Sequence, residues 1–398
     1  MSQSLSRAVI VSAVRTPIGK FGGTLLPMSA ADLGTVAAKG ALAAAGITGP
    51  EVSEVIFGHG RQAGGGPNTA RQIAWRSGCG ESVPAFTVNK ACASSLKAIT
   101  LAAQSILSGE NSIVLAGGAE SMSNTPYLMP GARWGNRMGT AELVDGMYRD
   151  GFLCPLCGQL MGDTAENLVQ KYGISRREQD EYAVTSQRRA AEAQSAGRFA
   201  GEIVPVDVPA KKGTIRFEAD EHLRPDATIE GLAKLAPVFR KDGTVHAGNS
   251  SGITDGAAAV VVMNEDEAGK RGLSPLAVIE GWSFAGVDPS VMGIGPIPAL
   301  DRLTEKLGFD LARDVDLFEM NEAFAAQVLA CLRLRPAVDL ARTNVNGGAI
   351  ALGHPIGATG ARIVTTLLHE MKRRGSGRGI ATLCVSGGMG AAVSFVRD

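Results

Sequence analysis

The chain has 398 residues, 45% of them hydrophobic and 20% charged, an ordinary composition for a folded protein of two or three domains. Its formal net charge is +0, so neither nucleic acid nor an anionic membrane surface is expected as the main partner. Six cysteines do not make a disulfide framework in a chain this long, and with no membrane-length apolar run and no targeting signal they indicate the cytoplasm.

The first 120 residues alternate short apolar runs with helical patterns, and such alternation indicates an α/β layered fold. An alanine-rich helix should end at Gly46, and a second helix should end near Gly109. The predicted strands are residues 8–14, 54–57 and 112–116, and the predicted helices are residues 31–45 and 93–107.

Cys92 directly precedes the second of these helices. Apolar residues occupy most of the circumference of that helix, so it must be buried. The N-terminus of a buried helix favours a thiolate, which makes Cys92 a candidate nucleophile. Position alone supports equally well a cysteine that is only a small buried hydrophobe.

The regular alternation of predicted strands and helices stops near Glu120. Residues 121–134 show little periodicity, residues 164–172 and 175–197 are charged and helical, and residues 207–252 are polar and rich in turns. Ser175, with a glutamate three residues on, forms a capping-box pattern. We interpret residues 121–252 as an insertion that covers a site, because irregular excursions from layered cores usually carry function.

After this segment the sequence again alternates predicted strands and helices. Its two ends also share weakly similar motifs. Val88-Asn89 precedes the Cys92 site, and Val345-Asn346 precedes a Gly-Gly pair. This suggests an internal duplication. Strands are predicted at residues 257–263, 276–279, 315–318, 343–345 and 380–385, and helices at residues 298–307, 323–332 and 358–374.

Three further clusters in this half carry groups suited to catalysis. His354 lies in Gly-His-Pro-Ile-Gly, a rigid loop that can aim an imidazole nitrogen, although a structural histidine is as well supported. Cys384 ends a strand before a glycine turn whose backbone N–H groups suit an oxyanion; a core cysteine is the alternative. Asn321 stands before a predicted helix, where an N-cap is the default interpretation.

Taken together, these clusters make the chain resemble the thiolase family of acetyl-CoA acetyltransferases and 3-ketoacyl-CoA thiolases over its whole length. The resemblance rests on ordered motifs in this sequence: residues 15–23, 89–95, 117–122, 161–167, 247–256, 295–298, 321–325, 344–360 and 384–390.

The resemblance implies a fold of five layers, α/β/α/β/α, built from two similar halves. Residues 1–120 with 253–276 would form the N-terminal half, residues 121–252 a loop domain that covers coenzyme A (CoA), and residues 277–398 the C-terminal half. Members are homotetramers or homodimers. No metal and no permanently bound cofactor is implied, since CoA and acyl-CoA are the substrates.

The implied reaction is reversible Claisen condensation and thiolysis by ping-pong chemistry, in fatty acid metabolism. Cys92 would carry the acyl group, His354 would take its proton, and Cys384 would move the α-proton of the second thioester. Asn321 would hold a water beside His354, and the backbone N–H of Ser386 would serve the oxyanion together with that of Cys92.

CoA contacts follow from the same resemblance. Arg224 would lie near the adenine, Ser251 would bind the pantetheine arm, and Met292 and Phe324 would line the tunnel. Short-chain members carry His where this chain has Leu160, before Met161, so longer acyl chains are expected. Ser386 also replaces a glycine of the family turn.

Two other functions remain open at this stage: a CoA-binding scaffold with little turnover, and a decarboxylating ketoacyl synthase on the same fold. The intact Cys92, His354 and Cys384 argue against the scaffold, and the second cysteine argues against the synthase. Cys154 and Cys157 fall outside the family pattern; they are interpreted as chance loop thiols, with a redox pair or zinc ligation less favoured.

Overall fold

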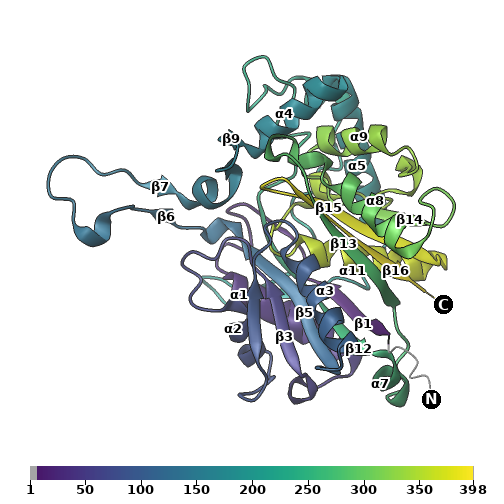
Figure 1. The fold of residues 1–398 in the computed structure, drawn as a ribbon. Coiled ribbons are helices and arrows are strands. Elements are labelled where there is room, and N and C mark those ends of the chain that lie inside the picture. Colours follow the sequence, from purple (N-terminus) through teal and green to yellow (C-terminus); the bar gives the residue numbers. More distant parts are fainter. Residues whose placement is uncertain (1–6, 398) are drawn as a thin grey trace.

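The structure is a computed structural model that describes residues 7–397. A ten-stranded mixed sheet runs through both halves of the chain in the order β14-β15-β16-β13-β1-β12-β5-β3-β4, with β2 beside β12 (Figure 1). Its strands are β1 (Ala8–Arg15), β2 (Gly19–Lys20), β3 (Glu54–Gly58), β4 (Ala85–Val88), β5 (Ile113–Ser121), β12 (Thr254–Asn264), β13 (Ala277–Gly286), β14 (Leu317–Met320), β15 (Arg378–Val385) and β16 (Met389–Val396).

Helices form three layers around the two parts of this sheet, which confirms the predicted five-layer fold. One outer layer packs on the N-terminal strands, a central layer lies between the halves, and the other outer layer packs on the C-terminal strands. In that order the layers contain α1 (Ala30–Ala45) and α2 (Thr69–Arg76); α3 (Ser94–Leu107) and α11 (Thr359–Arg374); and α8 (Pro296–Leu307) and α9 (Ala325–Leu334).

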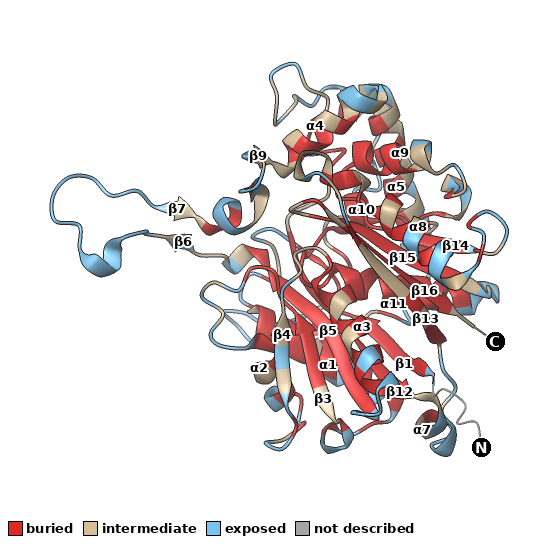
Figure 2. Ribbon diagram, viewed as in Figure 1, coloured by how far each residue is buried: buried red, intermediate tan, exposed pale blue. Residues whose placement is uncertain are grey.

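Most residues of the two central helices are buried (Figure 2). Leu96 of α3 and Leu367 of α11 belong to one core cluster with strand residues from both halves, including Ile10 and Leu383. Such a position requires a helix that is apolar around most of its surface. The loops that precede α3 and α11 are thereby brought to the junction of the halves.

The same pairing order recurs in the two halves. The pair β3–β5 is parallel and is followed by the antiparallel pairs β5–β12 and β12–β1; likewise β14–β15 is parallel and is followed by antiparallel β15–β16 and β16–β13. α3 leads into β5 as α11 leads into β15. The weak similarity between the two ends of the sequence therefore corresponds to a repeated architecture. The halves join where β1 pairs with β13.

Residues 121–252 carry most of the remaining elements. Ser175 caps α5 in the predicted capping box with Glu178. The division of the chain into two halves and a loop domain stays a prediction. These elements are β6 (Tyr127–Leu128), β7 (Val144–Asp145), β8 (Leu153–Cys154), β9 (Gln159–Leu160), α4 (Met161–Tyr172), α5 (Arg176–Ser195), β10 (Val206–Pro209), β11 (Thr214–Phe217) and α6 (Ile229–Ala233); outside the segment lie α7 (Glu265–Lys270) and α10 (Ala349–Leu352).

Two predicted elements differ from the structure, and one strand of the sheet is additional to those predicted in the C-terminal half. Residues 343–345 form no strand, because Asn344 adopts a left-handed φ of 48° and its amide binds the backbone of Met320 at 2.8 Å, in place of a strand ladder. β5 continues through Gly117 and Gly118 instead of ending there, because both glycines pair with β3 and β12; a side chain at Gly118 would run into the backbone of Gly357. The C-terminal strand β16 was not predicted.

Candidate active site

A cavity of about 480 Å³ lies where the two halves meet residues of the covering segment. Residues of both halves line it. The repeated architecture of the halves places these residues face to face. The structure thus brings together ten of the eleven predicted site residues, and the eleventh, Asn321, lies buried behind His354. The ten are Cys92, Leu160, Met161, Arg224, Ser251, Met292, Phe324, His354, Cys384 and Ser386.

A tight turn presents Cys92 to this cavity. Ala91 adopts a left-handed φ of 45°, which is uncommon for a residue with a side chain. The turn is held because the Ser94 hydroxyl donates to the Ala91 carbonyl at 2.6 Å and accepts from the Lys90 N–H at 2.9 Å. The backbone N–H groups of Ser386 and of Cys92 itself point at the sulfur.

The Cys92 sulfur is a thiol at rest. Burial raises the pKa of Cys92, and the Ser386 N–H and the Arg61 charge offset only part of that rise. The helix N-terminus alone would favour a thiolate, so here burial outweighs the effect expected from position. Attack by this sulfur therefore requires a base that removes its proton.

His354 has the tautomer that such a base needs. The Thr359 hydroxyl donates to the Pro355 carbonyl at 3.0 Å, so toward His354 Nδ1, 2.6 Å away, it can only accept. Nδ1 therefore carries the proton and Nε2 keeps its lone pair. Burial, followed by the charges of Arg362 and Arg61, lowers the pKa of His354 to about 3, so the ring is neutral.

Asn321 lies beside the basic nitrogen. Its Nδ2 is 3.5 Å from His354 Nε2, and its buried Oδ1 has no hydrogen-bond partner among residues 7–397. A buried orphan acceptor normally requires a water, which agrees with the expected role of this residue. The N-cap interpretation is wrong, because α9 begins at Ala325 with Phe324 at its N-cap.

Cys384 lies near the end of β15 and is fully buried except toward the cavity. Burial and the neighbouring sulfur of Cys92 raise the pKa of Cys384 well above the ordinary value, so it too is a thiol at rest. Both sulfurs line the same cavity, and as anions they would repel each other.

The turn after Cys384 tolerates the serine that replaces a glycine. Gly387 and Gly388 adopt φ values of 87° and 81°, whereas Ser386 does not adopt a positive φ. A side chain at Gly388 would also meet the backbone of Val287 and Pro289. The left-handed positions thus fall on true glycines, and the Ser386 N–H stays available as a donor.

Two residues of the site were not singled out by the sequence analysis. Glu120 is buried on β5 and accepts from the N–H groups of Gly60 at 3.0 Å, Arg61 at 3.1 Å and Gly357 at 2.8 Å. Although burial would raise the pKa of Glu120, His59 and Arg61 hold it low, so it is a carboxylate that joins the His354 loop to the opposite wall. Arg61 itself lines the cavity.

A second carboxylate secures the other end of the His354 segment. Glu322 accepts from Tyr182 at 2.9 Å, Ser186 at 2.7 Å and the N–H of Ile350 at 3.0 Å, so α10 is fastened to α5. Both carboxylates lie in motifs that the sequence analysis quoted, but a motif alone does not show which loops a side chain will join.

Cys154 and Cys157 lie at the tip of the β8–β9 hairpin that leads into Leu160. The Gly158 N–H donates to the Cys154 carbonyl at 2.9 Å, and both thiols are free. Among the described residues, no group of three or more His, Cys, Asp or Glu side chains could hold a metal ion. The role of this pair stays open.

We expect alkylation of Cys92 by iodoacetamide to accelerate with pH without reaching a plateau below about pH 9, because the thiolate reacts and its pKa is raised. Peptide mass spectrometry across a pH series would measure the rate at this cysteine alone. A plateau near pH 7 would instead mean that the proton has passed to His354 in the resting protein.

Comparison with known proteins gives consistent relatives. Family models described as "Thiolase, N-terminal domain" and "Thiolase, C-terminal domain" match residues 8–266 and 273–397. Acetyl-CoA acetyltransferases of Chromobacterium violaceum and Cupriavidus necator are each 52% identical to this chain, over 98% and 99% of it and over 99% and 100% of their own lengths.

Solved structures agree with these relatives. Acetyl-CoA acetyltransferase of Bacillus anthracis is 45% identical, with a TM-score of 0.96 over 99% of this chain and 100% of its own. Human mitochondrial 3-ketoacyl-CoA thiolase in complex with CoA is 43% identical, with a TM-score of 0.95 over 99% of this chain and 98% of its own.

Proposed function

The chain belongs to the thiolase family, and from this we propose that it moves acyl groups between CoA thioesters through an S-acyl intermediate on Cys92. The enzyme is an acetyl-CoA C-acyltransferase: it joins two acetyl-CoA into acetoacetyl-CoA and CoA, or cleaves a 3-ketoacyl-CoA with CoA. The observation that carries the acyl-enzyme proposal is the convergence of Cys92, His354 and Cys384 on one cavity.

In the thiolysis direction, His354 Nε2 takes the Cys92 proton and the sulfur attacks the 3-keto carbon. The oxyanion that forms is met by the N–H groups of Cys92 and Ser386, each worth about 2.7–4 kcal/mol in comparable sites. The carbon–carbon bond then breaks, and the departing acetyl-CoA enolate takes a proton from Cys384. His354 and a water on Asn321 stabilise the enolate oxygen.

The second half-reaction returns the enzyme to its starting state. Cys384, now a thiolate, takes the proton of an incoming CoA thiol, whose sulfur attacks the acyl group on Cys92 and releases acyl-CoA. The Cys92 sulfur leaves as a thiolate and takes back its proton from His354. Two thiols and one neutral imidazole are the protonation states from which cleavage starts, and they are the states that burial favours here.

CoA would enter along the remaining walls of the cavity. Ser251 lines it and is fixed by a 3.0 Å bond from its N–H to the Ala323 carbonyl, which suits contact with the pantetheine arm. Phe324 packs edge-on against Phe239 with ring centroids 6.2 Å apart, and Met292 is buried beside it. We place Arg224, at the same cavity, near the adenine end.

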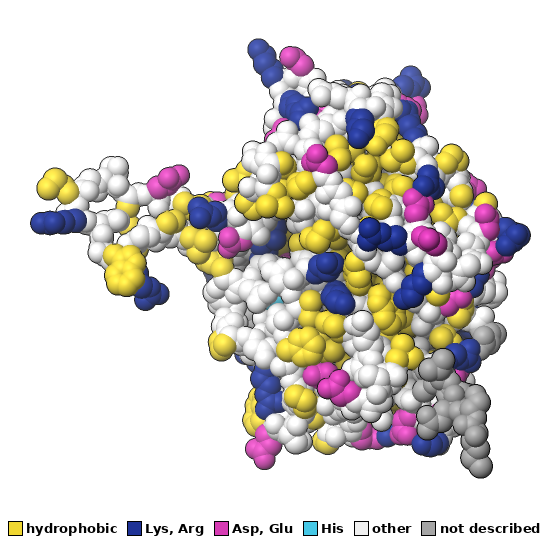
Figure 3. Space-filling model, in the orientation of Figure 1, with side chains coloured by type: hydrophobic (Ala, Val, Ile, Leu, Met, Phe, Trp, Pro, Cys, Tyr) yellow, Lys and Arg dark blue, Asp and Glu magenta, His cyan; other side chains and the backbone are white. Residues whose placement is uncertain are grey.

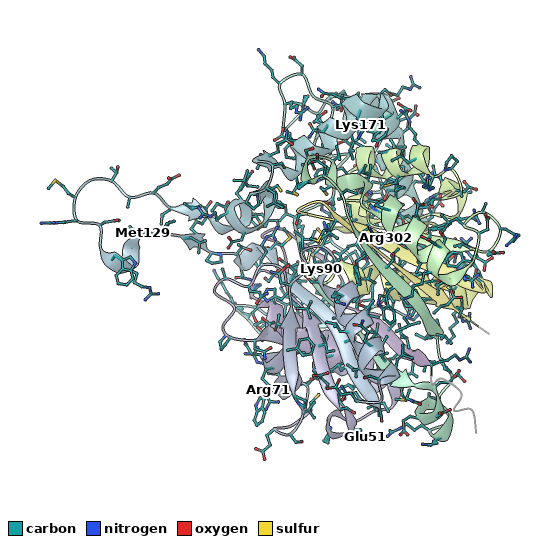
Figure 4. The ribbon with its side chains drawn as sticks, in the orientation of Figure 1. Glu51, Arg71, Lys90, Met129, Lys171 and Arg302 are labelled. Atoms are coloured by element: carbon teal, nitrogen blue, oxygen red, sulfur yellow. The ribbon has the colours of Figure 1, made fainter. Side chains whose placement is uncertain are left out.

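The enzyme would work as a homodimer or homotetramer in the cytoplasm, in fatty acid metabolism. The β6–β7 segment projects from the body as a long arm (Figure 1), with hydrophobic side chains along it in Figure 3 and Met129 labelled in Figure 4. Trp134 and Met138 on this arm are 88% and 95% exposed, which suits burial against a second copy.

All six cysteines are free, as in a reducing compartment. No helix within residues 7–397 is long and apolar enough to cross a membrane.

The test is a thiolysis assay with free CoA and a chain-length series of 3-oxoacyl-CoA. We expect turnover of acetoacetyl-CoA with ping-pong kinetics, and undiminished kcat/KM at six carbons, because Leu160 lines the cavity where short-chain members carry His and each buried methylene adds roughly 0.8 kcal/mol. Leu160→His should lower activity on the longer substrate more than on acetoacetyl-CoA. No turnover at any length would leave a CoA-binding scaffold, and turnover of acetoacetyl-CoA alone would remove the role given to Leu160.

A further inference from the structure

Arg61 is a buried cation without a partner on the wall of the catalytic cavity. Its side chain lines the cavity together with Cys92 and His354, and the residue is only 7% exposed. Within residues 7–397 its guanidinium makes no ion pair and no hydrogen bond, and its Nε is among the buried atoms that lack a partner. The Glu120 carboxylate acts on this charge without forming a side-chain ion pair with it. A buried guanidinium with no direct ion pair or hydrogen bond is costly, so it calls for a further anion.

The surroundings fix Arg61 in this position. Its N–H donates to Glu120 at 3.1 Å, and its guanidinium lies over the Phe152 ring, 5.6 Å from the centroid. Gly151 lies so close to Arg61 that a side chain there would overlap the guanidinium. By contrast, the buried Arg15 has its own anions, with Asp220 at 2.7 Å and Glu202 at 2.7 Å.

The walls near Cys92 otherwise suit a hydrocarbon chain. Met122 and Ile356 form an apolar cluster there, with Cys92 and Phe152 packed against it, and all four line the cavity. An acyl group on the Cys92 sulfur would therefore run along apolar side chains and meet one cation. A few polar groups placed among apolar walls are what usually fix the orientation of a substrate and select it.

We propose that Arg61 binds a carboxylate at the distal end of the acyl group, so that the enzyme acts on 3-oxo-dicarboxylic acyl-CoA thioesters. This inference rests on the thiolase function proposed above. With 3-oxoadipyl-CoA, Cys92 attacks the keto carbon, acetyl-CoA leaves, and a succinyl group stays on the sulfur with its free carboxylate toward Arg61. CoA then releases succinyl-CoA. A guanidinium matches a carboxylate through two parallel N–H donors.

Two other anions fit the position less well. The Cys92 sulfur already receives the N–H groups of Ser386 and of its own residue, and it is a thiol at rest, so it gives Arg61 no standing negative charge. The phosphates of CoA are separated from the thioester by the whole pantetheine arm, whereas Arg61 lies over Phe152, which packs with Cys92 against the same apolar cluster.

The test compares two substrates of equal carbon number, 3-oxoadipyl-CoA and 3-oxohexanoyl-CoA, in the wild-type enzyme and in Arg61→Met. We expect the wild type to favour the carboxylate substrate, and the variant to lose about 10- to 100-fold in kcat/KM on it, as for a lost charged hydrogen bond. Because the Arg61 charge also acts on Cys92 and His354, acetoacetyl-CoA thiolysis can fall as well, and the readout is the ratio of the two losses, which should be larger on 3-oxoadipyl-CoA than on acetoacetyl-CoA. Arg302→Met, a cation outside the cavity on α8 (Figure 4), is the matched control and should keep the wild-type preference.

If Arg61→Met folds poorly, the acylation half-reaction tests the same proposal without that variant. Wild-type enzyme and Arg61→Lys, which keeps the charge, are mixed with succinyl-CoA or butyryl-CoA, and acylation of Cys92 is followed by intact mass. Succinyl-CoA should acylate Cys92 faster than butyryl-CoA in both proteins, and the difference between the two rates should be smaller in Arg61→Lys. Equal losses on all substrates, or no preference in the wild type, would overturn the proposal while thiolysis of acetoacetyl-CoA still supports the family reaction. Absence of that thiolysis would instead refute the proposed function.

Discussion

Cys92→Ser should lower kcat for acetoacetyl-CoA thiolysis by about 10³- to 10⁶-fold, the range seen when a covalent nucleophile is removed. A serine hydroxyl keeps the size and position of the group but is far less acidic and less nucleophilic than a thiol. A neutral imidazole whose pKa is lowered, such as that of His354, removes the proton of a hydroxyl far less readily than the proton of a thiol. The rate is measured with equal amounts of folded protein, checked by circular dichroism.

Cys79→Ser is the matched control for this substitution. Cys79 is also a buried free thiol, but it belongs to the core around α1 and α2 and does not line the cavity. It should cost stability and leave kcat close to that of the wild type. Retained turnover in Cys92→Ser would contradict the acyl-enzyme route, because the reaction would then not need the Cys92 sulfur to carry the acyl group.

Cys384→Ala should slow thiolysis by about 10²- to 10⁴-fold, the contribution typical of a positioned acid or base. The first acyl transfer should survive, because acetyl-CoA can acylate Cys92 with His354 alone as the base. Intact mass after mixing with acetyl-CoA would show the adduct on the variant. Its absence would mean that the roles of the two thiols cannot be separated.

Cys331→Ala provides a control close to the same site. Its thiol lies on α9 near enough to raise the pKa of Cys384, yet it stays outside the cavity and donates to the Gly293 carbonyl at 3.4 Å. We expect it to keep both acylation and turnover. A loss of turnover in Cys331→Ala equal to that in Cys384→Ala would point to packing around β15 instead of proton transfer.

The local features of the site were predictable from the sequence, because each is written in a short segment. Cys92 before an all-round apolar helix, and Cys384 between a strand and glycines, are patterns that the structure reproduces at α3 and at the β15–β16 turn. Their convergence was predictable only through the family resemblance, since no local pattern states that α3 and α11 pack together.

The residues that were missed act through distant partners. Glu120 has no special sequence context, but in the fold it joins loops at Gly60 and Gly357. Arg61 looks like any loop arginine until its burial at the wall of the cavity is known. The wrong strand at residues 343–345 has the same origin, because the side chain of Asn344 competes with the backbone ladder.

The position of β1 has a consequence for synthesis on the ribosome. This first strand pairs with β12 and, at Val9 and Ile10, with β13, so its edges stay open until residues as late as Ala277 and Val278 have emerged. Long-range pairings of this kind fold slowly and leave apolar strands unprotected in the nascent chain. The enzyme should consequently depend on holdase chaperones during translation more than a protein whose sheet grows in sequence order.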